Sequence, residues 1–411
     1  MQKLNFINDK KELFVFFIIL TLTLIFTLLF QYNNYKTITT NSIYKTQAQV
    51  INKYEKEDFD VYKLQTDDFT FFTSTSKEVA LEKLDFLDIS ILTLNISFID
   101  YLKGFYAKSF NIYKFQKNTI KKDLSDNIKS QHVDKNISEI YEAIFLAIPT
   151  NSGLRDIFAI YSISHLIAIS GFHLGVLSFI LYFVLYYPYD YLHNRYFPYR
   201  NKRFDILCVV VSILFIYLIF TNLVPSLLRA FVMMILGIFI LRANIKLISF
   251  ETLLITLLFI LVVFPKYIFS ISLWFSILGV FYIFLFIKYF QNLNKMFLFI
   301  FFNIWIFASF NPVVHYFFGV TSLIQLSSPL ITFVFTLFYP FELFLHLIGY
   351  GSLLDKFLNY SISLDFYTYE VFTPLWFFVT YLLVSFFSIF SRYFFYFLNI
   401  LLMFFNIYIY Y

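Results

Sequence analysis

The chain has 411 residues, of which 60% are hydrophobic and only 14% charged. Its apolar runs repeatedly reach the roughly 18 to 20 residues that cross a bilayer, which excludes an ordinary soluble domain and predicts a polytopic α-helical membrane protein. The net charge of +5 does not by itself indicate nucleic acid, and the single cysteine, Cys208, excludes an intramolecular disulfide.

The N-terminus reads as a retained membrane anchor. Lys3, Lys10 and Lys11 precede an apolar run over residues 13–30, and no small-residue cleavage site follows that run. We therefore predict a cytoplasmic N-terminus and an anchor over residues 1–30, with residues 31–143 in the periplasm.

The polar insert after the anchor carries β-strand patterns. Short runs at 47–53, 61–65, 69–73 and 89–94 alternate or are rich in β-forming residues, with charged turns between them. Their number and length predict a small all-β, OB-like barrel over residues 31–130, although any small β-meander fits the same pattern. Residues 131–150 are expected to form an amphipathic helix on the membrane surface, because Ile137 to Ile148 combine helical apolar spacing with a polar face.

Residues 151–411 are almost wholly apolar and are predicted to form a transmembrane channel domain. With the anchor, about nine or ten spans are expected, some broken or re-entrant: 155–187 (broken near 170), 205–221, 227–243, 249–264, 268–288, 296–310, 321–347, 371–390 and 393–411. The positive-inside rule places the loop with Arg195, Arg200, Lys202 and Arg203 in the cytoplasm. If each intervening segment spans the membrane once, Arg242 with Lys246, and Lys288 with Lys295, fall on the same side.

The segment from Ser164 to Tyr182, SHLIAISGFHLGVLSFILY, puts two histidines and a Ser-Gly break inside an apolar run. Such interruptions mark permeation or binding sites in membrane proteins. The alternative is that His165 and His173 are hydrogen-bonded core residues that clamp a kinked helix, which is the commoner structural role. Their eight-residue spacing does not match a helical zinc pair.

Two arginines lie near or within apolar helices. Arg229, in PSLLRAFVMMILG, either faces a partner or a water-filled path, or snorkels to the headgroups. Arg155, after Leu154, can guide phosphate or anchor a headgroup. Polar residues also interrupt the apolar stretches 270–279 and 317–330, either as a second broken segment or as ordinary interhelical hydrogen bonds.

The stretch from Tyr101 to Lys122 contains six lysines, six aromatic residues and no acid. Lysines attract phosphate and flat rings stack bases, so this pattern favours single-stranded nucleic acid. The alternative is that the rings face the barrel core or the headgroups, while the lysines form a solvated or lipid-binding edge. No nucleotide-binding loop or hydrolase motif is present, so no hydrolytic activity is expected.

Together, four of these segments resemble the signature of the ComEC family of competence proteins. They are SHLIAISGFHLGVL with the preceding Leu154 to Asp156, SLLRAFVMM, SISLWFSILGV after Pro265, and FFGVTSLIQLSSPL. The resemblance covers about residues 140–350. Ser272 stands where the family has glutamine, Ser327 or Ser328 where it has asparagine, and the barrel has no cysteine pair. The chain ends at Tyr411 without the metallo-β-lactamase-like nuclease of many relatives, so that activity is expected in another protein.

The resemblance implies transport of single-stranded DNA across the inner membrane during natural transformation, without enzymatic activity, metal or cofactor. The implied DNA path contains Arg155, His165, Ser170, Gly171, His173, Gly175 and Arg229. The strand would first meet Lys103, Tyr106, Lys108, Phe110, Lys114 and Lys117 in the barrel. The implied partners are single-stranded DNA, the lipid bilayer, a periplasmic DNA receptor, a cytoplasmic helicase or translocase motor, and other copies of the chain in a homo-oligomer.

Two other classes of function fit some of the same residues. An intramembrane enzyme, metal-dependent or acting on a lipid-linked substrate, would use His165 and His173 with Glu342. A small-anion carrier would use Arg229 as its anion site.

Overall fold

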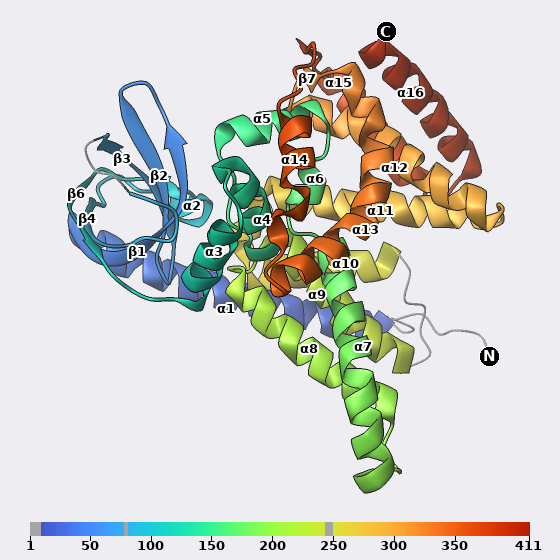
Figure 1. The fold of residues 1–411 in the computed structure, drawn as a ribbon, viewed down its shortest axis with the longest axis horizontal. Helices are drawn as coiled ribbons and strands as arrows, with labels where there is room; N and C mark the ends of the chain where they lie inside the picture. Colours follow the sequence, from blue (N-terminus) through green and yellow to red (C-terminus); the bar gives the residue numbers. More distant parts are fainter. Residues whose placement is uncertain (1–9, 78–80, 243–249) are drawn as a thin grey trace. The chain divides into compact units, whose positions relative to one another are not determined.

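The computed structural model describes residues 10–77, 81–242 and 250–411, so Lys3 and Lys246 lie outside the described residues. The protein is mostly helical, with a β-sheet domain after the first helix (Figure 1). It divides into two compact units. The first comprises residues 1–152, 169–247 and 254–274, and the second comprises 153–168, 248–253 and 275–411.

The first helix, α1 (Lys10–Thr39), continues well beyond the predicted end of the anchor at residue 30. Its last turns belong to the β domain, because Ile38 is part of the buried barrel core and the Tyr35 hydroxyl donates to the Ile96 carbonyl at 2.8 Å. Its apolar half exposes large side chains such as Phe26, as expected for a helix surrounded by lipid.

The sheet that follows has the strand order β5-β3-β2-β1-β4-β6. Strand β5 runs parallel to β3, and β6 runs antiparallel to β4. Because β5 and β6 are consecutive, this final segment pairs with both edges and curls the sheet into a barrel with the OB-type strand order. The strands are β1 (Ile43–Glu55), β2 (Phe59–Gln65), β3 (Thr70–Ser76), β4 (Phe86–Leu92), β5 (Phe105–Tyr106) and β6 (Ser109–Phe115), with α2 (Phe98–Lys103) before β5.

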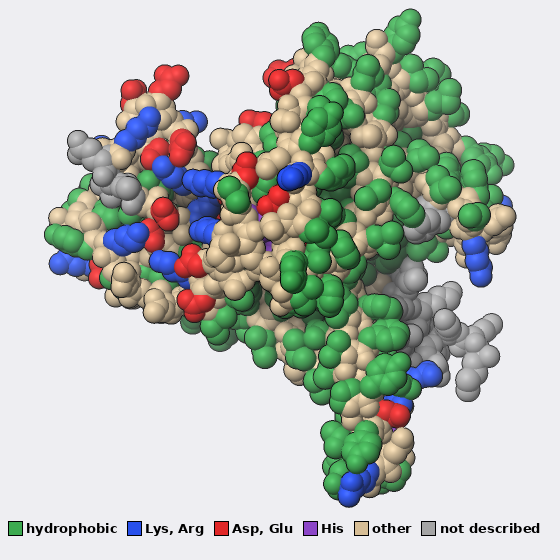
Figure 2. Space-filling model, in the orientation of Figure 1, with side chains coloured by type: hydrophobic (Ala, Val, Ile, Leu, Met, Phe, Trp, Pro, Cys, Tyr) green, Lys and Arg blue, Asp and Glu red, His purple; other side chains and the backbone are tan. Residues whose placement is uncertain are grey.

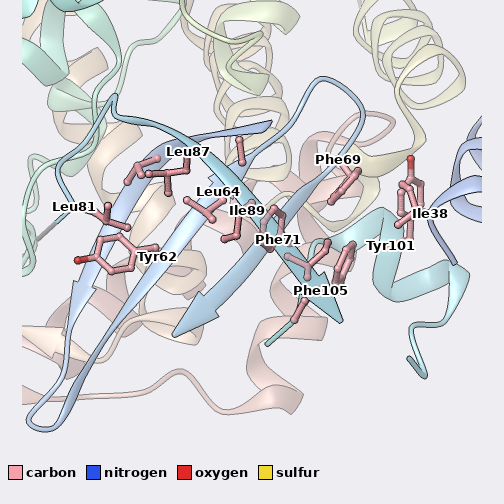
Figure 3. Close-up of a cluster of buried hydrophobic side chains, with 14 residues drawn as sticks. Ile38, Tyr62, Leu64, Phe69, Phe71, Leu81, Leu87, Ile89, Tyr101 and Phe105 are labelled. Carbon is pink, nitrogen blue, oxygen red and sulfur yellow. The ribbon is translucent and has the colours of Figure 1, made fainter. Parts of the chain in front are cut away.

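The barrel interior follows from the two-residue alternation of the strands. Leu64, Phe71 and Leu87 are fully buried, and Phe69 and Phe105 stack beside them (Figure 3). All four β-rich runs of the sequence form strands, which confirms the predicted β domain. Strands β5 and β6 lie in the lysine- and aromatic-rich segment, where no strand was predicted.

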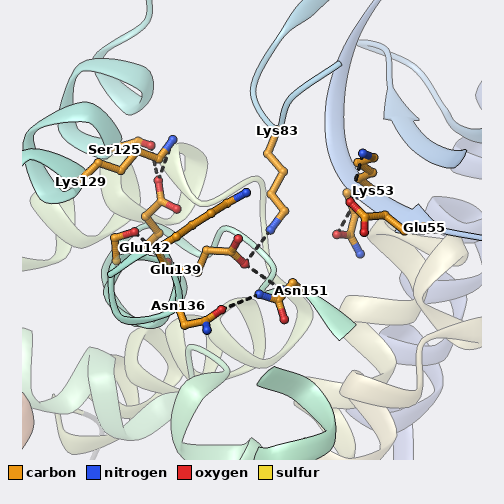
Figure 4. A network of polar contacts seen from close by, with 12 residues as sticks. Lys53, Glu55, Lys83, Ser125, Lys129, Asn136, Glu139, Glu142 and Asn151 are labelled. Atoms are coloured by element: carbon orange, nitrogen blue, oxygen red, sulfur yellow. Dashed lines mark hydrogen bonds and ion pairs between the residues drawn. The ribbon is translucent and has the colours of Figure 1, made fainter. Parts of the chain in front are cut away.

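Two helices follow the barrel, α3 (Ile120–Gln131) and α4 (Lys135–Leu146). Every residue of α4 from Ile137 to Leu146 is buried, so the expected exposed polar face is not found. The acids of that face are paired inside the protein instead (Figure 4). Glu139 accepts from Lys83 at 3.1 Å, and Glu142 binds Ser125 and Lys129. Whether α4 lies along a membrane surface stays a prediction.

The membrane part contains apolar helices near every predicted span. Seven of the described helices are long and apolar enough to cross a membrane, and three shorter ones are apolar. The helices after α4 are α5 (Ser152–Ile160), α6 (Ser164–Ile167), α7 (Gly171–Tyr196), α8 (Lys202–Phe220), α9 (Pro225–Arg242), α10 (Phe250–Val263), η1 (Pro265–Phe269), α11 (Ile271–Phe290), α12 (Lys295–Phe317), η2 (Leu323–Ser327), α13 (Ser328–Leu347), η3 (Gly351–Leu354), α14 (Asp355–Ile362), α15 (Leu375–Phe387) and α16 (Arg392–Tyr410). A short β7 (Val320–Thr321) pairs with β8 (Tyr369–Glu370).

The second unit is stabilised by aromatic packing and by side-chain hydrogen bonds between helices. Tyr282, Trp305 and Tyr381 are buried in one hydrophobic cluster. Asn311 of α12 donates to Asn406 of α16 at 2.6 Å, which satisfies two amides that would be costly in an apolar interior. The C-terminal helix is thereby hydrogen-bonded to its neighbour.

Candidate functional site

The break in the histidine motif lies where the sequence predicts it. Helix α6 ends at Ile167 and α7 begins at Gly171, with Ser170 as its N-cap. The Ser170 hydroxyl accepts from the Phe172 N–H at 3.3 Å, and His173 Nδ1 accepts from the Ser170 N–H at 3.1 Å. The pair forms a capping box that satisfies amides at the start of a helix. His173 is fully buried and therefore acts as the helix clamp that the sequence allows as an alternative.

Arg229 of α9 packs directly against the start of α7. A Cβ atom at Gly171 would lie 3.2 Å from the Arg229 guanidinium and 3.2 Å from Ala230 Cβ, so a larger residue here would require these neighbours to shift by a few tenths of an ångström. The Ser226 hydroxyl donates to the Ile169 carbonyl at 2.6 Å, a carbonyl that the helix break leaves without a ladder partner. The structure thus brings two distant motifs of the sequence together.

This junction is electropositive and nearly closed to solvent. Arg229 is 7% exposed, and its guanidinium also contacts Met233 Sδ at 3.3 Å. The N-terminus of α7 adds the partial positive charge of a helix start. The charge of the guanidinium and the positive end of the helix dipole together make this junction suited to attract phosphate and other anions.

Gly175 has a different environment from Gly171. It is exposed, and a Cβ atom there would meet nothing within 4 Å. The sequence places both glycines on the DNA path implied by the family resemblance, as residues that interrupt the helical ladder. Only the packing of α9 distinguishes them.

The remaining residues of the predicted path, Arg155 and His165, belong to the second unit. Arg155 is partly exposed on α5, and His165 is exposed on α6 with Nε2 3.4 Å from Thr332 Oγ1. Gln325 lies in the polar run 317–330 but was not assigned to the path, and its amide donates to the Ala159 carbonyl at 3.1 Å, near the end of α5. A lone glutamine in an apolar run was the signal that could have indicated it.

Ser328 has a related role. Its hydroxyl donates to the Ser162 carbonyl at 2.9 Å, so the polar run 317–330 satisfies carbonyls at the α5–α6 junction. This run contains a short 3₁₀ helix, η2, rather than continuous α-helix.

The six barrel residues predicted to receive the strand do not form one row. Lys114 is 2.7 Å from Asp85, an acid from outside the acid-free segment. Lys117 lies over the Phe86 ring, at 4.9 Å from its centroid, whereas Lys103 lies over Phe269 of η1 at 5.0 Å. Lys108 and Tyr106 are exposed, and Phe110 is partly buried. Figure 2 shows lysines mixed with acids on the drawn face of the β domain.

The residues of the enzymatic alternative are divided between the two units, with His173 in the first unit and His165 and Glu342 in the second. Glu342 is fully buried on α13, with His346 Nδ1 3.4 Å from its carboxylate. Across residues 10–77, 81–242 and 250–411, no three His, Cys, Asp or Glu side chains lie close enough to hold one metal ion.

The comparisons with known proteins agree with the motifs. A profile of the family described as competence protein matches residues 150–409, well over half of the chain, and this range includes the broken helix, Arg229 and the polar run 317–330. Neither the curated proteins nor the solved structures contain a match. The chain therefore belongs to the ComEC-type family of competence proteins, which function in DNA uptake.

Proposed function

We propose that the protein transports single-stranded DNA across the inner membrane during natural transformation. The observation that carries the proposal is the packing of Arg229 on Gly171 at the N-terminus of α7. Two motifs of the competence segment meet there in a nearly buried cationic junction. Arginines within membrane segments are rare and commonly mark functional paths, and a phosphate backbone is a ligand that suits a guanidinium.

The connectivity of the first unit supports one direction of transport. Helices α7 and α8 meet at the arginine-rich turn around Arg200, which the positive-inside rule assigns to the cytoplasm. At the opposite ends of these helices, Tyr217 donates to the Phe145 carbonyl of α4 at 3.0 Å, and Tyr267 of η1 donates to the Leu223 carbonyl at 2.6 Å. Since Lys103 of the β domain also contacts η1, the β domain belongs to the end opposite Arg200.

In this proposal the β domain is periplasmic and receives the strand, with Lys103, Lys108 and Tyr106 as first contacts. A periplasmic DNA receptor supplies the strand. A cytoplasmic helicase or translocase supplies the motion, because neither the motifs nor the described residues suggest a nucleotide site. Arg229 and the start of α7 then attract successive phosphates.

The test is a deletion strain fed with labelled duplex DNA. We expect DNA to accumulate in a nuclease-protected periplasmic state while none reaches the cytoplasm, and expression of the wild-type chain should restore cytoplasmic arrival. Unchanged cytoplasmic arrival in the deletion strain would exclude the transport function. If the strain instead loses uptake of a small anion while importing DNA normally, the carrier alternative holds.

A further inference from the structure

The outer face of the barrel carries a row of lysine and aromatic side chains. Lys63 of β2 lies opposite Phe72 of β3, with its ammonium 5.6 Å from the ring centroid. Tyr106 of β5 pairs beside Phe72 in the next strand. Their neighbours in sequence, such as Phe71, point into the core, so this alternation leaves the row on the outside (Figure 3).

Helix α2 connects this row to η1. It ends at Gly104, whose φ of +91° is a backbone conformation that L side chains rarely adopt. A Cβ atom there would lie 3.0 Å from Thr70 Oγ1 and 3.9 Å from the Phe72 ring. The preceding Lys103 lies over the Phe269 ring of η1, with its ammonium 5.0 Å from the ring centroid.

A third lysine, Lys266, lies on η1 itself. Partial burial and, second, the positive charge of Lys63 lower the pKa of Lys266, so these two ammonium groups are near enough to repel each other. Among the residues that the structure describes, no ion pair joins Lys63, Lys103 or Lys266 to a carboxylate. In this they differ from Lys114, whose charge is compensated by Asp85.

We propose that Lys63, Lys103 and Lys266, with the rings of Phe72 and Phe269, form a site for the phosphate backbone of single-stranded DNA, where the barrel meets η1. Three uncompensated cations favour a polyanion, and the two rings offer faces on which bases stack. This inference rests on the proposed transport function and adds to it a defined place of transfer.

The position of the site relative to Arg229 supports a transfer role. Tyr267, next to Lys266 in η1, is hydrogen-bonded to Leu223 in the turn before α9. Helix α9 begins two residues later and carries Ser226 and Arg229 to the start of α7. A few consecutive contacts within the first unit therefore join the lysines to the buried arginine junction.

The test compares two double variants of the full-length protein in nanodiscs of zwitterionic lipid. Lys63→Gln with Lys266→Gln removes two charges of the site, and Lys45→Gln with Lys56→Gln removes two exposed charges elsewhere on the β domain. Binding of a fluorescent oligo-dT strand is measured against salt concentration. Each lost phosphate contact lowers the salt slope by about 0.7, so the first variant should lose about 1.4 and the control much less.

An unchanged slope in the Lys63/Lys266 variant, or an equal loss in the control, would overturn the proposal. A difference between variants that depends on anionic lipid in the nanodiscs would assign the lysines to lipid headgroups instead. Transformation separates this inference from the transport function. A deletion strain that imports DNA refutes both, whereas normal import by the Lys63/Lys266 variant in a strain that needs the wild-type chain refutes the site alone.

Discussion

The outer face of the β domain and the junction of α7 with α9 both carry positive charge, but they hold it differently. The barrel lysines are mostly exposed, and those with a close partner each have a separate ring or acid, as do Lys63, Lys103, Lys114 and Lys117. Arg229 is 7% exposed and packs tightly against Gly171, where a Cβ atom would lie only 3.2 Å from its guanidinium. Removing one charge from a solvated face should change DNA binding only slightly. Adding a single methyl group to a closely packed junction should disturb stability and transport much more.

The steepest response is expected at Gly171. Gly171→Val adds three carbons where the first already comes within 3.2 Å of Ala230 and Arg229. Overpacking of this kind costs about 1–3 kcal/mol, so transformation should fall by about tenfold or more at matched protein levels.

Gly175→Val is the matched control, because a Cβ atom at Gly175 meets nothing within 4 Å in the same helix. Transformation should remain near the wild-type frequency in that strain. Equal defects in the two strains would mean that helix propensity, rather than packing of α9, explains the effect.

Removal of the Arg229 charge should have the second-largest effect on transformation. Arg229→Leu deletes a group that costs about 2.5–3.5 kcal/mol at a helix centre, so membrane insertion should be at least as efficient as in the wild type. Transformation should nevertheless fall by about tenfold, and Arg229→Lys should recover part of it, because phosphate attraction needs charge more than the planar guanidinium. Normal transformation by Arg229→Leu would indicate that this arginine only snorkels.

Substitutions of His173 should have a smaller effect on transformation. They distinguish the role of His173 as a helix cap from any further role of its imidazole. His173→Ala removes the acceptor of the Ser170 N–H, and loss of such a cap costs about 0.5–2 kcal/mol. Glutamine is the ordinary partner at this capping-box position, so His173→Gln should retain much of the thermal stability and transformation frequency. If His173→Gln keeps the melting temperature but loses transformation, the imidazole does more than clamp the helix.

Within the barrel, two lysines of the same segment should behave oppositely. Lys108 is exposed, and Lys108→Gln should lower the salt slope of oligo-dT binding by about 0.7 without changing the melting temperature. Lys114→Gln leaves Asp85, which is 3% exposed, without its closest cation, so it should lower the melting temperature with little change in the slope. The reverse outcome would restore Lys114 to the strand-receiving surface.

The contrast between the two regions also explains what could be predicted from the sequence. The apolar helices, the break before Gly171 and four of the strands follow from local sequence patterns, and the structure confirms them, with seven of the described helices long and apolar enough to cross a membrane. The pairing of Lys114 with Asp85 and the contact of Gly171 with Arg229 join residues far apart in the chain. Periodicity contains no information about such contacts.

Helix α4 shows the same limit. Its polar residues have the spacing of a solvated face, yet Glu139 and Glu142 find Lys83, Ser125 and Lys129 inside the protein. The sequence alone does not distinguish a buried, paired glutamate from a hydrated one. The amphipathic pattern therefore predicted the helix correctly and its exposed polar face incorrectly.

The smallest expected effect concerns Lys121, a lysine of the acid-free segment that faces protein rather than solvent. Its ammonium lies 5.7 Å from the Phe220 ring centroid, and burial lowers the pKa of Lys121 to about 8. The folded pKa is below the unfolded value of 10.5, so the unfolded chain binds more protons between about pH 8 and 10.5, and stability should rise with pH in that window.

Lys121→Met should remove this penalty and raise the free energy of unfolding below pH 8 by an amount on the order of 1 kcal/mol, after allowance for the solvent that still reaches the side chain. Thermal unfolding of the purified protein across pH 7–10.5 measures the effect, with the exposed Lys135→Met as the control. The Lys121→Met curve should approach the wild-type curve at the upper end, where the wild-type ammonium is neutral. Parallel wild-type and Lys121→Met curves would show that this ammonium is hydrated, and would return Lys121 to the graded, exposed charges of the barrel face.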